Sequence, residues 1–260
     1  MRRDNIFWGI ALILLGALFL LQQQGLIANA FDLFWPVVLI LLGGWIVFGV
    51  FWKPKTITGA NFTVPLGTAR HVRYRFNHGA AQVMINGNAP TGMAMIGSSG
   101  TAGNYKSRSD GDRLEVKVET GPSFIPILGP GDGVWQYQIT KDVPATLTIE
   151  AGASQFDIDL QDTLTSQVEL KVGASTVNVT MPAHGVSELE IEGGAATFNV
   201  RIPEGTAARI DTLEGFVSLN VDESRFPKGE SKLYSSTNFD SAADRVLIVI
   251  KAGVGSVNVK

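Results

Sequence analysis

The sequence predicts a membrane-anchored all-β protein, in which a two-helix transmembrane hairpin precedes a β-solenoid (single-stranded β-helix-like) domain of stacked short strands. Two observations predict this fold class. The long apolar runs fall at the beginning of the 260-residue chain, and a glycine-led motif recurs at a fixed step in its second half. We expect the hairpin over residues 1–55 and the β domain over residues 56–260.

The glycine-led motif organises the second half of the chain. Four heptapeptides begin at glycines that stand 21 residues apart, and a fifth copy begins at Gly253. Self-similarity at a fixed period indicates units that stack and bury a shared core. The regular repeats, which we predict at about 21 residues each, cover residues 145–222. Their glycines are Gly152, Gly173, Gly194 and Gly215.

Each repeat is expected to contain two short strands with a bend at the glycine. Apolar residues stand five and three positions before the glycine, as at Leu147 and Ile149, and four and six positions after it, as at Phe156 and Ile158. A spacing of two places both side chains on one face of a strand. One unit cannot bury this apolar face alone, whereas a stack of units can.

A polar residue separates the two apolar residues that follow each glycine, and it must point to the opposite face of the strand. We expect these residues to stack about 4.8 Å apart and to share amide hydrogen bonds. A calcium-binding nonapeptide repeat is the competing interpretation, but that motif has a nine-residue period with an aspartate each time. The first position is Asp157, and the expected column comprises Asn178, Asn199 and Asn220, with Asn258 in the last copy.

Two apolar runs predict membrane spans over about residues 6–27 and 33–52. The second reaches about 30 Å as a helix, which matches the hydrocarbon core of a bilayer. The apolar part of the first run, residues 6–21, reaches only about 24 Å and needs the glutamines that follow to complete a span.

The charges that flank the spans predict their orientation. Arginines precede the first span and lysines follow the second, whereas the connection between them has neither. The positive-inside rule therefore places both termini in the cytoplasm and the protein in the inner or plasma membrane. A secretory signal peptide with a cleavage site near Ala28-Asn29-Ala30 is the competing interpretation, and the second span that follows at once favours the hairpin.

Segment 121–133 separates two predicted strands, Arg113–Glu119 and Trp135–Ile139, and is too rich in Gly and Pro to be a regular element. It either contacts the membrane or a partner, or folds over the open end of the solenoid. The apolar residues that would make this contact are Phe124, Ile125, Ile127 and Leu128.

The end of the chain leaves one alternative open. Residues 225–252 interrupt the repeat and form either a longer rung or a separate hairpin. The terminal strand Gly253–Lys260 is expected to be the exposed end of the stack, because nothing follows to cap it. Such an end can accept strands from another chain.

Residues that usually carry chemistry are scarce. The chain has no cysteine, and its three histidines, His71, His78 and His184, fit no metal-ligand spacing, so we expect them to be solvated. No nucleophile elbow or phosphate-binding loop is present. The net charge of −3 and the absence of a basic tract give no support for nucleic-acid binding. We expect no catalytic, cofactor or metal site, and no enzyme.

Two stretches resemble a known bacterial family. The sequence Leu-Ile-Leu-Leu-Gly occurs twice, ending at Gly16 and at Gly43, and Trp35-Pro36 opens the second span; this pattern resembles the LiaI–LiaF-like transmembrane region of envelope-stress proteins. The heptapeptide from Gly79 and the glycine-led repeats are similar to the toastrack β domain of LiaF-type proteins. Many members of that family have four spans, whereas this sequence predicts two.

The resemblance implies a non-enzymatic membrane regulator that modulates a two-component sensor kinase during cell-envelope stress through protein–protein contacts. Its partners would be the lipid bilayer and the sensor kinase or another membrane protein. The alternative is a membrane-tethered scaffold that forms homo-oligomers through the solenoid ends, as bactofilins do. An enzyme acting on lipid or cell wall is the third hypothesis, but no residue is nominated as its nucleophile or base.

Overall fold

In the computed structural model, the chain divides into two compact units, Met1–Lys55 and Thr56–Lys260. Among the residues that the structure describes, no helix has the length and apolar character to cross a membrane. Nearly all of the two predicted spans lie outside the described residues. The described residues are 20, 22–25, 60–79, 81–99, 104–119, 134–229 and 233–260.

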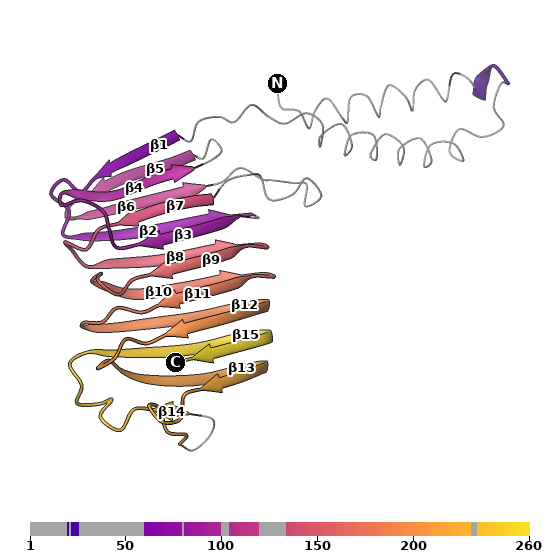
Figure 1. The fold of residues 1–260 in the computed structure, drawn as a ribbon. Coiled ribbons are helices and arrows are strands. Elements are labelled where there is room, and N and C mark those ends of the chain that lie inside the picture. The colour runs from indigo at the N-terminus through magenta and orange to yellow at the C-terminus, as the bar shows by residue number, and fades with distance from the viewer. Residues whose placement is uncertain are drawn as a thin grey trace. The chain divides into compact units, whose positions relative to one another are not determined.

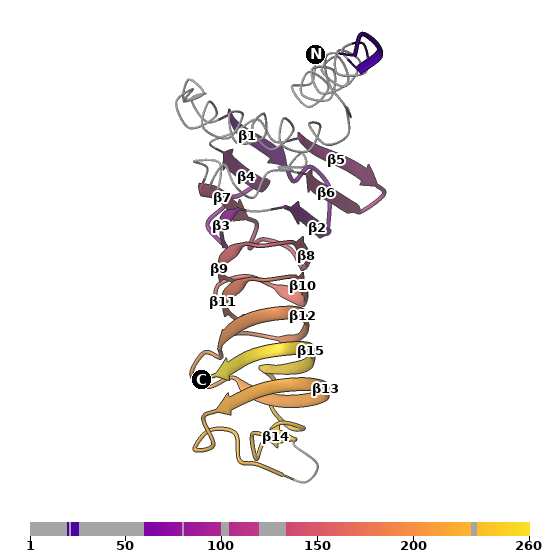
Figure 2. The ribbon, with the colours of Figure 1, turned by 90° about the vertical axis from the view of Figure 1, so that its right-hand side faces the viewer.

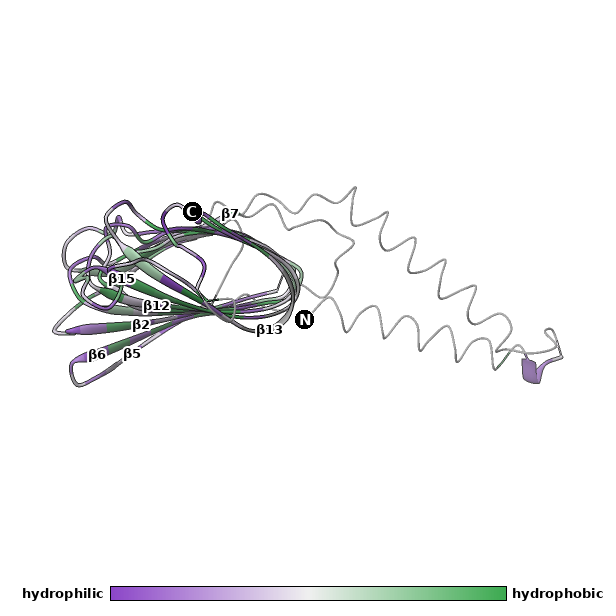
Figure 3. Cartoon of the chain, turned by 90° about the horizontal axis from the view of Figure 1, so that it is seen from below, coloured by the Kyte–Doolittle hydropathy of each residue, from purple (hydrophilic) through white to green (hydrophobic). Residues whose placement is uncertain are grey.

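The second unit is a stack of β rungs in two layers, and the stack is visible from two directions in Figures 1 and 2. The described strands form one 15-stranded sheet that folds over on itself. Seen along the stack in Figure 3, the two layers lie close together, so each rung is a flattened loop. This architecture confirms the predicted domain of short stacked strands.

Each rung places one strand in each layer. The first layer contains, in spatial order, β5 (Asn104–Asp110), β6 (Arg113–Glu119), β2 (His71–His78), β8 (Ala145–Ala151) and β10 (Thr165–Val172). The second contains β1 (Ala60–Pro65), β4 (Met93–Ser99), β7 (Val134–Ile139), β3 (Gln82–Asn86), β9 (Gln155–Asp159) and β11 (Thr176–Thr180). Three long strands bend and serve both layers: β12 (Val186–Arg201), β15 (Arg245–Val259) and β13 (Ala207–Val221). The two-residue strand β14 (Tyr234–Ser235) pairs with β13.

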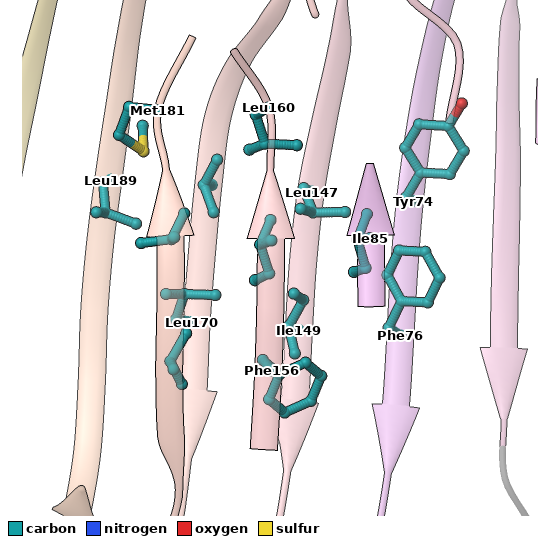
Figure 4. Close-up of a cluster of buried hydrophobic side chains, with 14 of the residues drawn as sticks. Tyr74, Phe76, Ile85, Leu147, Ile149, Phe156, Leu160, Leu170, Met181 and Leu189 are labelled. Carbon is teal, nitrogen blue, oxygen red and sulfur yellow. The ribbon is translucent and has the colours of Figure 1, made fainter. Parts of the chain in front are cut away.

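The repeat determines the register of the stack. Val168 pairs with Leu189, and Val177 pairs with Phe198, so equivalent positions of the 21-residue repeat lie side by side in parallel strands. Their side chains form buried apolar columns that fill the interior (Figure 4). Burying one such Val, Leu, Ile or Phe side chain stabilises the fold by about 1.5–3 kcal/mol. The stacked columns therefore hold together rungs that could not fold alone.

Close approach of the backbone explains two of the glycine bends. A Cβ on Gly173 would lie 2.8 Å from the carbonyl oxygen of Gly152, and a Cβ on Gly152 would lie 2.8 Å from that of Gly79. Gly194 follows in the same column at 3.4 Å from the Gly173 oxygen. Gly215 lies in β13 where the pairing with β15 is irregular, between Glu214 and Phe216.

The spatial order of the rungs differs from the chain order at the C-terminal end. Strand β15 lies between β12 and β13 and is parallel to both. The expectation that Gly253–Lys260 forms the exposed end of the stack was therefore wrong, because this segment is an interior rung. The chain leaves β13, adds β14 against it in antiparallel orientation, and returns to begin β15 at Arg245.

Core composition gives a physical reason for this order. An interior rung needs apolar side chains at both core positions of its first strand, and β15 supplies Ile248 and Ile250, both fully buried. Strand β13 supplies Ile210 but has Thr212 at the second position, opposite Ile250. The rung with the poorer apolar pair therefore takes the end of the stack, where it has a rung on one side only.

The segment between β13 and β15 covers the end of the first layer. Phe226 and Tyr234 are 1% and 8% exposed and join the apolar core. The guanidinium of Arg225 donates to the carbonyl oxygens of Ile202 and Pro203, both at 2.9 Å. These hydrogen bonds attach the segment between β13 and β15 to the turn that follows β12.

The N-terminal end of the stack is closed by strands that were not predicted. Strands β1, β4 and β5 are antiparallel to their neighbours, and β2 and β3 lie inside β6 and β7. The ring of Phe62 in β1 stacks on Tyr105 in β5 at 4.4 Å. The same ring lies over Gly97, where a Cβ would come within 2.1 Å of it. Gly97 is itself part of β4.

Candidate functional site

A directed ladder of amides lies on the outward face of the second layer. Nδ2 of Asn258 donates to Oδ1 of Asn199, and Nδ2 of Asn199 donates to Oδ1 of Asn178, both at 2.8 Å. Nδ2 of Asn178 then donates to Oδ1 of Asp157 at 2.6 Å. All three bonds point the same way, and the ladder ends on a carboxylate, which only accepts hydrogen bonds when ionised.

The ladder explains why its first position is an aspartate. On its other side, Asp157 pairs in register with Met84 of β3, which offers no amide. A side chain that only accepts hydrogen bonds suits this position, because the pairing with Met84 does not require a donor. At the opposite end, Asn220 pairs in register with Asn258, so the spatial order is Asn178, Asn199, Asn258 and then Asn220. The insertion of β15 causes this order.

An open hollow of about 1080 Å³ lies over the ladder. Asn178, Asn199 and Asn258 form part of its floor, and the turns after β12 and β13 contribute to its rim. The rim carries both signs of charge. Its charged side chains are Arg201, Glu204, Asp222, Arg225 and Lys260. The hollow therefore offers hydrogen-bond donors and acceptors to a polar surface.

A buried histidine forms a second unusual site. His78 is 4% exposed, and its Nε2 lies 3.4 Å from the Tyr137 hydroxyl. Its ring lies edge-on to Trp135 and Phe156 at 5.5 and 6.2 Å. Among the described residues, Nδ1 has no hydrogen-bond partner. Burial in this aromatic cluster lowers the pKa of His78 to about 4, so the imidazole is neutral near pH 7.

The expectation of solvated histidines was wrong for His78. The alternation of β2 carries the signal that could have found it, because Val72, Tyr74 and Phe76 precede His78 at steps of two and all face the core. His71 lies on the outward face of β2 and is half-buried. His184 is exposed and lies 3.4 Å from a carboxylate oxygen of Asp244.

A buried tyrosine ties the two layers together near the N-terminal end. The Tyr74 hydroxyl donates to the carbonyl oxygen of Ala94 in β4 and accepts from the backbone N–H of Thr140 at 3.3 Å. Burial raises the pKa of Tyr74 well above its ordinary value. The Tyr74 hydroxyl therefore stays protonated near pH 7 and acts as a structural hydrogen-bond donor.

Comparison with protein families decides the identity of the domain. The family model described as the N-terminal domain of toast_rack, DUF2154, matches residues 53–205, which is more than half of the chain. The chain belongs to the toast_rack family. A second model, of the LiaI-LiaF-like transmembrane region, matches residues 6–52. This toast_rack protein is thus of the LiaF type, and its N-terminal region indicates a location in the membrane.

A solved structure supports the fold of the toast_rack domain. The chain is similar to the crystal structure of a "putative cell adhesion protein" from Clostridium sporogenes ATCC 15579, with a TM-score of 0.67 and 18% identity. The similarity covers 80% of this chain and 99% of that chain. At this identity it bears on the fold alone. No curated protein matches the sequence.

The remaining predicted contact residues of the toast_rack protein cannot be placed on the domain. Phe124, Ile125, Ile127 and Leu128 lie outside the described residues. Within the part of the chain that the structure describes, no group of three or more His, Asp or Glu side chains is arranged to hold a metal ion.

The glutamates of β10 and β12 lie on the outward face of the first layer. The Lys171 ammonium lies 2.7 Å from Glu169, and the Lys251 ammonium lies 2.6 Å from Glu190. Exposed pairs of this kind contribute little to stability, because water screens the two charges. Glu188 and Glu192 lie on the same face in β12, beside these pairs. This row of carboxylates is a charged surface that a partner could contact.

Proposed function

We propose that this toast_rack protein is a non-enzymatic regulator of cell-envelope stress signalling in a bacterial membrane. In this proposal its β domain modulates a two-component sensor kinase through protein–protein contacts. Membership of the toast_rack family and the LiaI-LiaF-like region support the regulatory role. The transfer from family to role is by analogy, so the proposal rests on the surface of the domain.

The observation that carries the proposal is the contrast between the interior and the faces of the stack. The interior is filled with apolar columns, and the buried Tyr74 hydroxyl joins the two layers. The polar rows that remain, the amide ladder and the carboxylate row, face outward on opposite layers. A domain built in this way offers extended polar surfaces for contact with a partner.

We infer that both termini, and with them the β domain, lie in the cytoplasm. Arg2 and Arg3 precede the first predicted span, and Lys53 and Lys55 follow the second. The positive-inside rule supports this orientation. It would bring the β domain to the side of the membrane on which a sensor kinase transfers phosphate.

The scaffold alternative receives less support from the ends of the stack. End-to-end growth needs an open rung, but Phe226 and Tyr234 cover one end of the core, and the antiparallel strands β1 and β5 lie at the other. Antiparallel edges do not continue a parallel stack. The edges of the described sheet are therefore β1, β5 and the second half of β13.

Crosslinking in the native membrane tests the proposal. Because the chain has no cysteine, Glu188→Cys and Glu192→Cys each place one reactive thiol on the carboxylate row. We expect a thiol-to-amine crosslinker to attach a membrane sensor kinase at these positions. Asp142→Cys, in the turn before β8, is the matched control at an exposed acidic position. Crosslinks that reach only further copies of this chain would instead favour the scaffold.

A further inference from the structure

Charge is segregated along the stack. Residues 60–119 contain seven Lys and Arg and four Asp and Glu, whereas residues 134–260 contain ten and seventeen. The net charges are therefore +3 and −7. The first set forms strands β1 to β6, which gather at one end of the stack in Figures 1 and 2. The near-neutral charge of the whole chain conceals this asymmetry.

Five of the seven cations of this end lie on one surface. Arg75, Lys117 and Lys106 are directly opposite one another across β2, β6 and β5. The neighbouring row contains Arg73, Glu115 and Arg108 in the same arrangement. In β2 these positions alternate with buried Val72, Tyr74 and Phe76, so both rows point outward. The basic face comprises Arg73, Arg75, Lys106, Arg108 and Lys117.

Among the residues that the structure describes, the basic face is incompletely neutralised. Arg75 lies 3.3 Å from Glu115, and Lys117 and Lys106 lie 2.6 and 3.6 Å from Glu119. Two carboxylates thus offset the charge of five cations. Like charges directly opposite on neighbouring strands are destabilising, so the row of Arg75, Lys117 and Lys106 is a cost to the fold that an external anion would offset.

The strand that carries two of these cations is open to solvent. Strand β5 is the edge of the first layer, and every residue from Tyr105 to Asp110 is exposed. Figure 3 shows hydrophilic residues at the ends of β5 and β6 that extend beyond the other strands. An edge with charged side chains resists pairing with another strand, which favours a ligand that contacts side chains.

The covalent structure brings this edge within reach of the bilayer. The transmembrane region matches up to residue 52, and β1 begins at Ala60. The seven intervening residues span at most about 25 Å. Strand β1 lies at the same end of the stack as β5, since Phe62 stacks on Tyr105.

The acidic part of the domain lies at the other end. Strand β13 is seven strand positions from β5 in the first layer, which is about 34 Å at the usual strand spacing. Repulsion between these carboxylates and a charged membrane is screened over that distance, because the Debye length is about 8 Å at physiological salt.

We propose that the basic face binds anionic lipid headgroups and holds the β5 end of the domain against the membrane. The acidic end then points away and stays free for protein contacts. This proposal needs no particular protein partner, so it stands or falls independently of the kinase hypothesis. Each cation near an anionic surface strengthens such binding about fivefold, so the loss of two should weaken it about 30-fold.

Fluorescence quenching in nanodiscs tests the proposal with the full chain. Ser107→Cys on β5 and Thr237→Cys beyond β14 each give a unique site for a fluorophore, and the quencher is a lipid with a spin-labelled headgroup. In phosphatidylcholine discs containing phosphatidylglycerol, we expect strong quenching at position 107 and little at 237. Pure phosphatidylcholine, or 1 M salt with its Debye length of about 3 Å, should remove the quenching at position 107.

Charge variants separate this proposal from others. Lys106→Gln with Arg108→Gln should weaken binding to anionic lipid about 30-fold and reduce the quenching accordingly. Lys171→Gln with Lys251→Gln, which removes two cations from the acidic region, should leave the quenching unchanged. Thermal unfolding of both variants checks that the domain remains folded. Equal quenching in the two lipid mixtures, or equal effects of the two variants, would overturn the proposal. Protection of position 107 only when another membrane protein is added would assign the basic face to that protein.

Discussion

The direction of the amide ladder predicts that Asn and Asp are not interchangeable along it. Asn199 donates to Asn178 and accepts from Asn258, both at 2.8 Å. Asn199→Asp keeps the shape and the acceptor but removes the donor, and it places a carboxylate oxygen against the Asn178 carbonyl oxygen. Asp157→Asn makes the opposite exchange at the terminal acceptor, where no donor is required.

The two substitutions should differ in cost. Asn199→Asp loses one hydrogen bond and leaves an acceptor facing a charge, which together cost about 2–3 kcal/mol. Asp157→Asn turns a charge-assisted bond into a neutral one and costs about 1 kcal/mol. In a domain of this size each kcal/mol lowers Tm by about 2–4 °C. Unfolding of the full chain in nanodiscs, followed by circular dichroism, measures the difference.

The cost of Asn199→Asp should depend on pH. Repulsion from Asn178 raises the pKa of the introduced carboxyl in the folded state, so its penalty is present at neutral pH and fades as the pH falls and the group protonates. A protonated carboxyl can also donate, which restores the ladder. If the two substitutions cost the same, or if the penalty of Asn199→Asp does not change with pH relative to the native chain, the directed ladder is refuted.

Three further predictions concern the core. Gly173→Ala should lower the stability by about 2 kcal/mol or more, because its Cβ would lie 2.8 Å from the Gly152 oxygen. Gly194→Ala, whose Cβ would lie 3.4 Å from the Gly173 oxygen, should lower the stability clearly less in the same unfolding assay. Equal losses would contradict the close approach of the backbone at Gly173. Burial lowers the folded-state pKa of His78 to about 4, whereas its unfolded-state pKa is near 6.5. The contribution of neutral His78 to the free energy of unfolding should therefore be fully present above pH 6.5 and should fall by about 3 kcal/mol as the pH drops to 4. His78→Phe should lack this pH-dependent loss, and a pH profile that the substitution leaves unchanged would contradict the role of His78. Removing β15 by truncation after Asp244 should abolish cooperative unfolding, since β15 joins β12 to β13; a truncated chain that loses only a few degrees in Tm would place β15 at the end of the stack.

The sequence predicted which residues share a column better than it predicted the order of the rungs. Alternation and the 21-residue step were sufficient to align Val177 with Phe198, because parallel strands in register repeat their contacts. The same pattern fits any order of equivalent rungs, so the position of β15 did not follow from it. Thr212 in place of an apolar core residue was the one sequence signal that β13 is the poorer interior rung.

Other features were missed for different physical reasons. Strands β1, β4 and β5 are antiparallel additions outside the repeat, and β5 has no buried residue among Tyr105–Asp110 to mark it. The prediction of a solvated His78 followed from its residue type, whereas its position on the inward face of β2 determines its burial. The basic face depends on the meeting of β2, β6 and β5 in space, which no local pattern in the sequence indicates.

The most direct test of the regulatory role is an envelope-stress reporter measured in cells that lack this chain. We predict that deletion changes the reporter output in the presence of a cell-wall antibiotic, and that the full chain restores it. A chain with Glu188→Lys and Glu192→Lys should reach the membrane in normal amount but fail to restore the output, because the carboxylate row is reversed while the core is intact. An output that deletion leaves unchanged, with and without the antibiotic, would contradict the account.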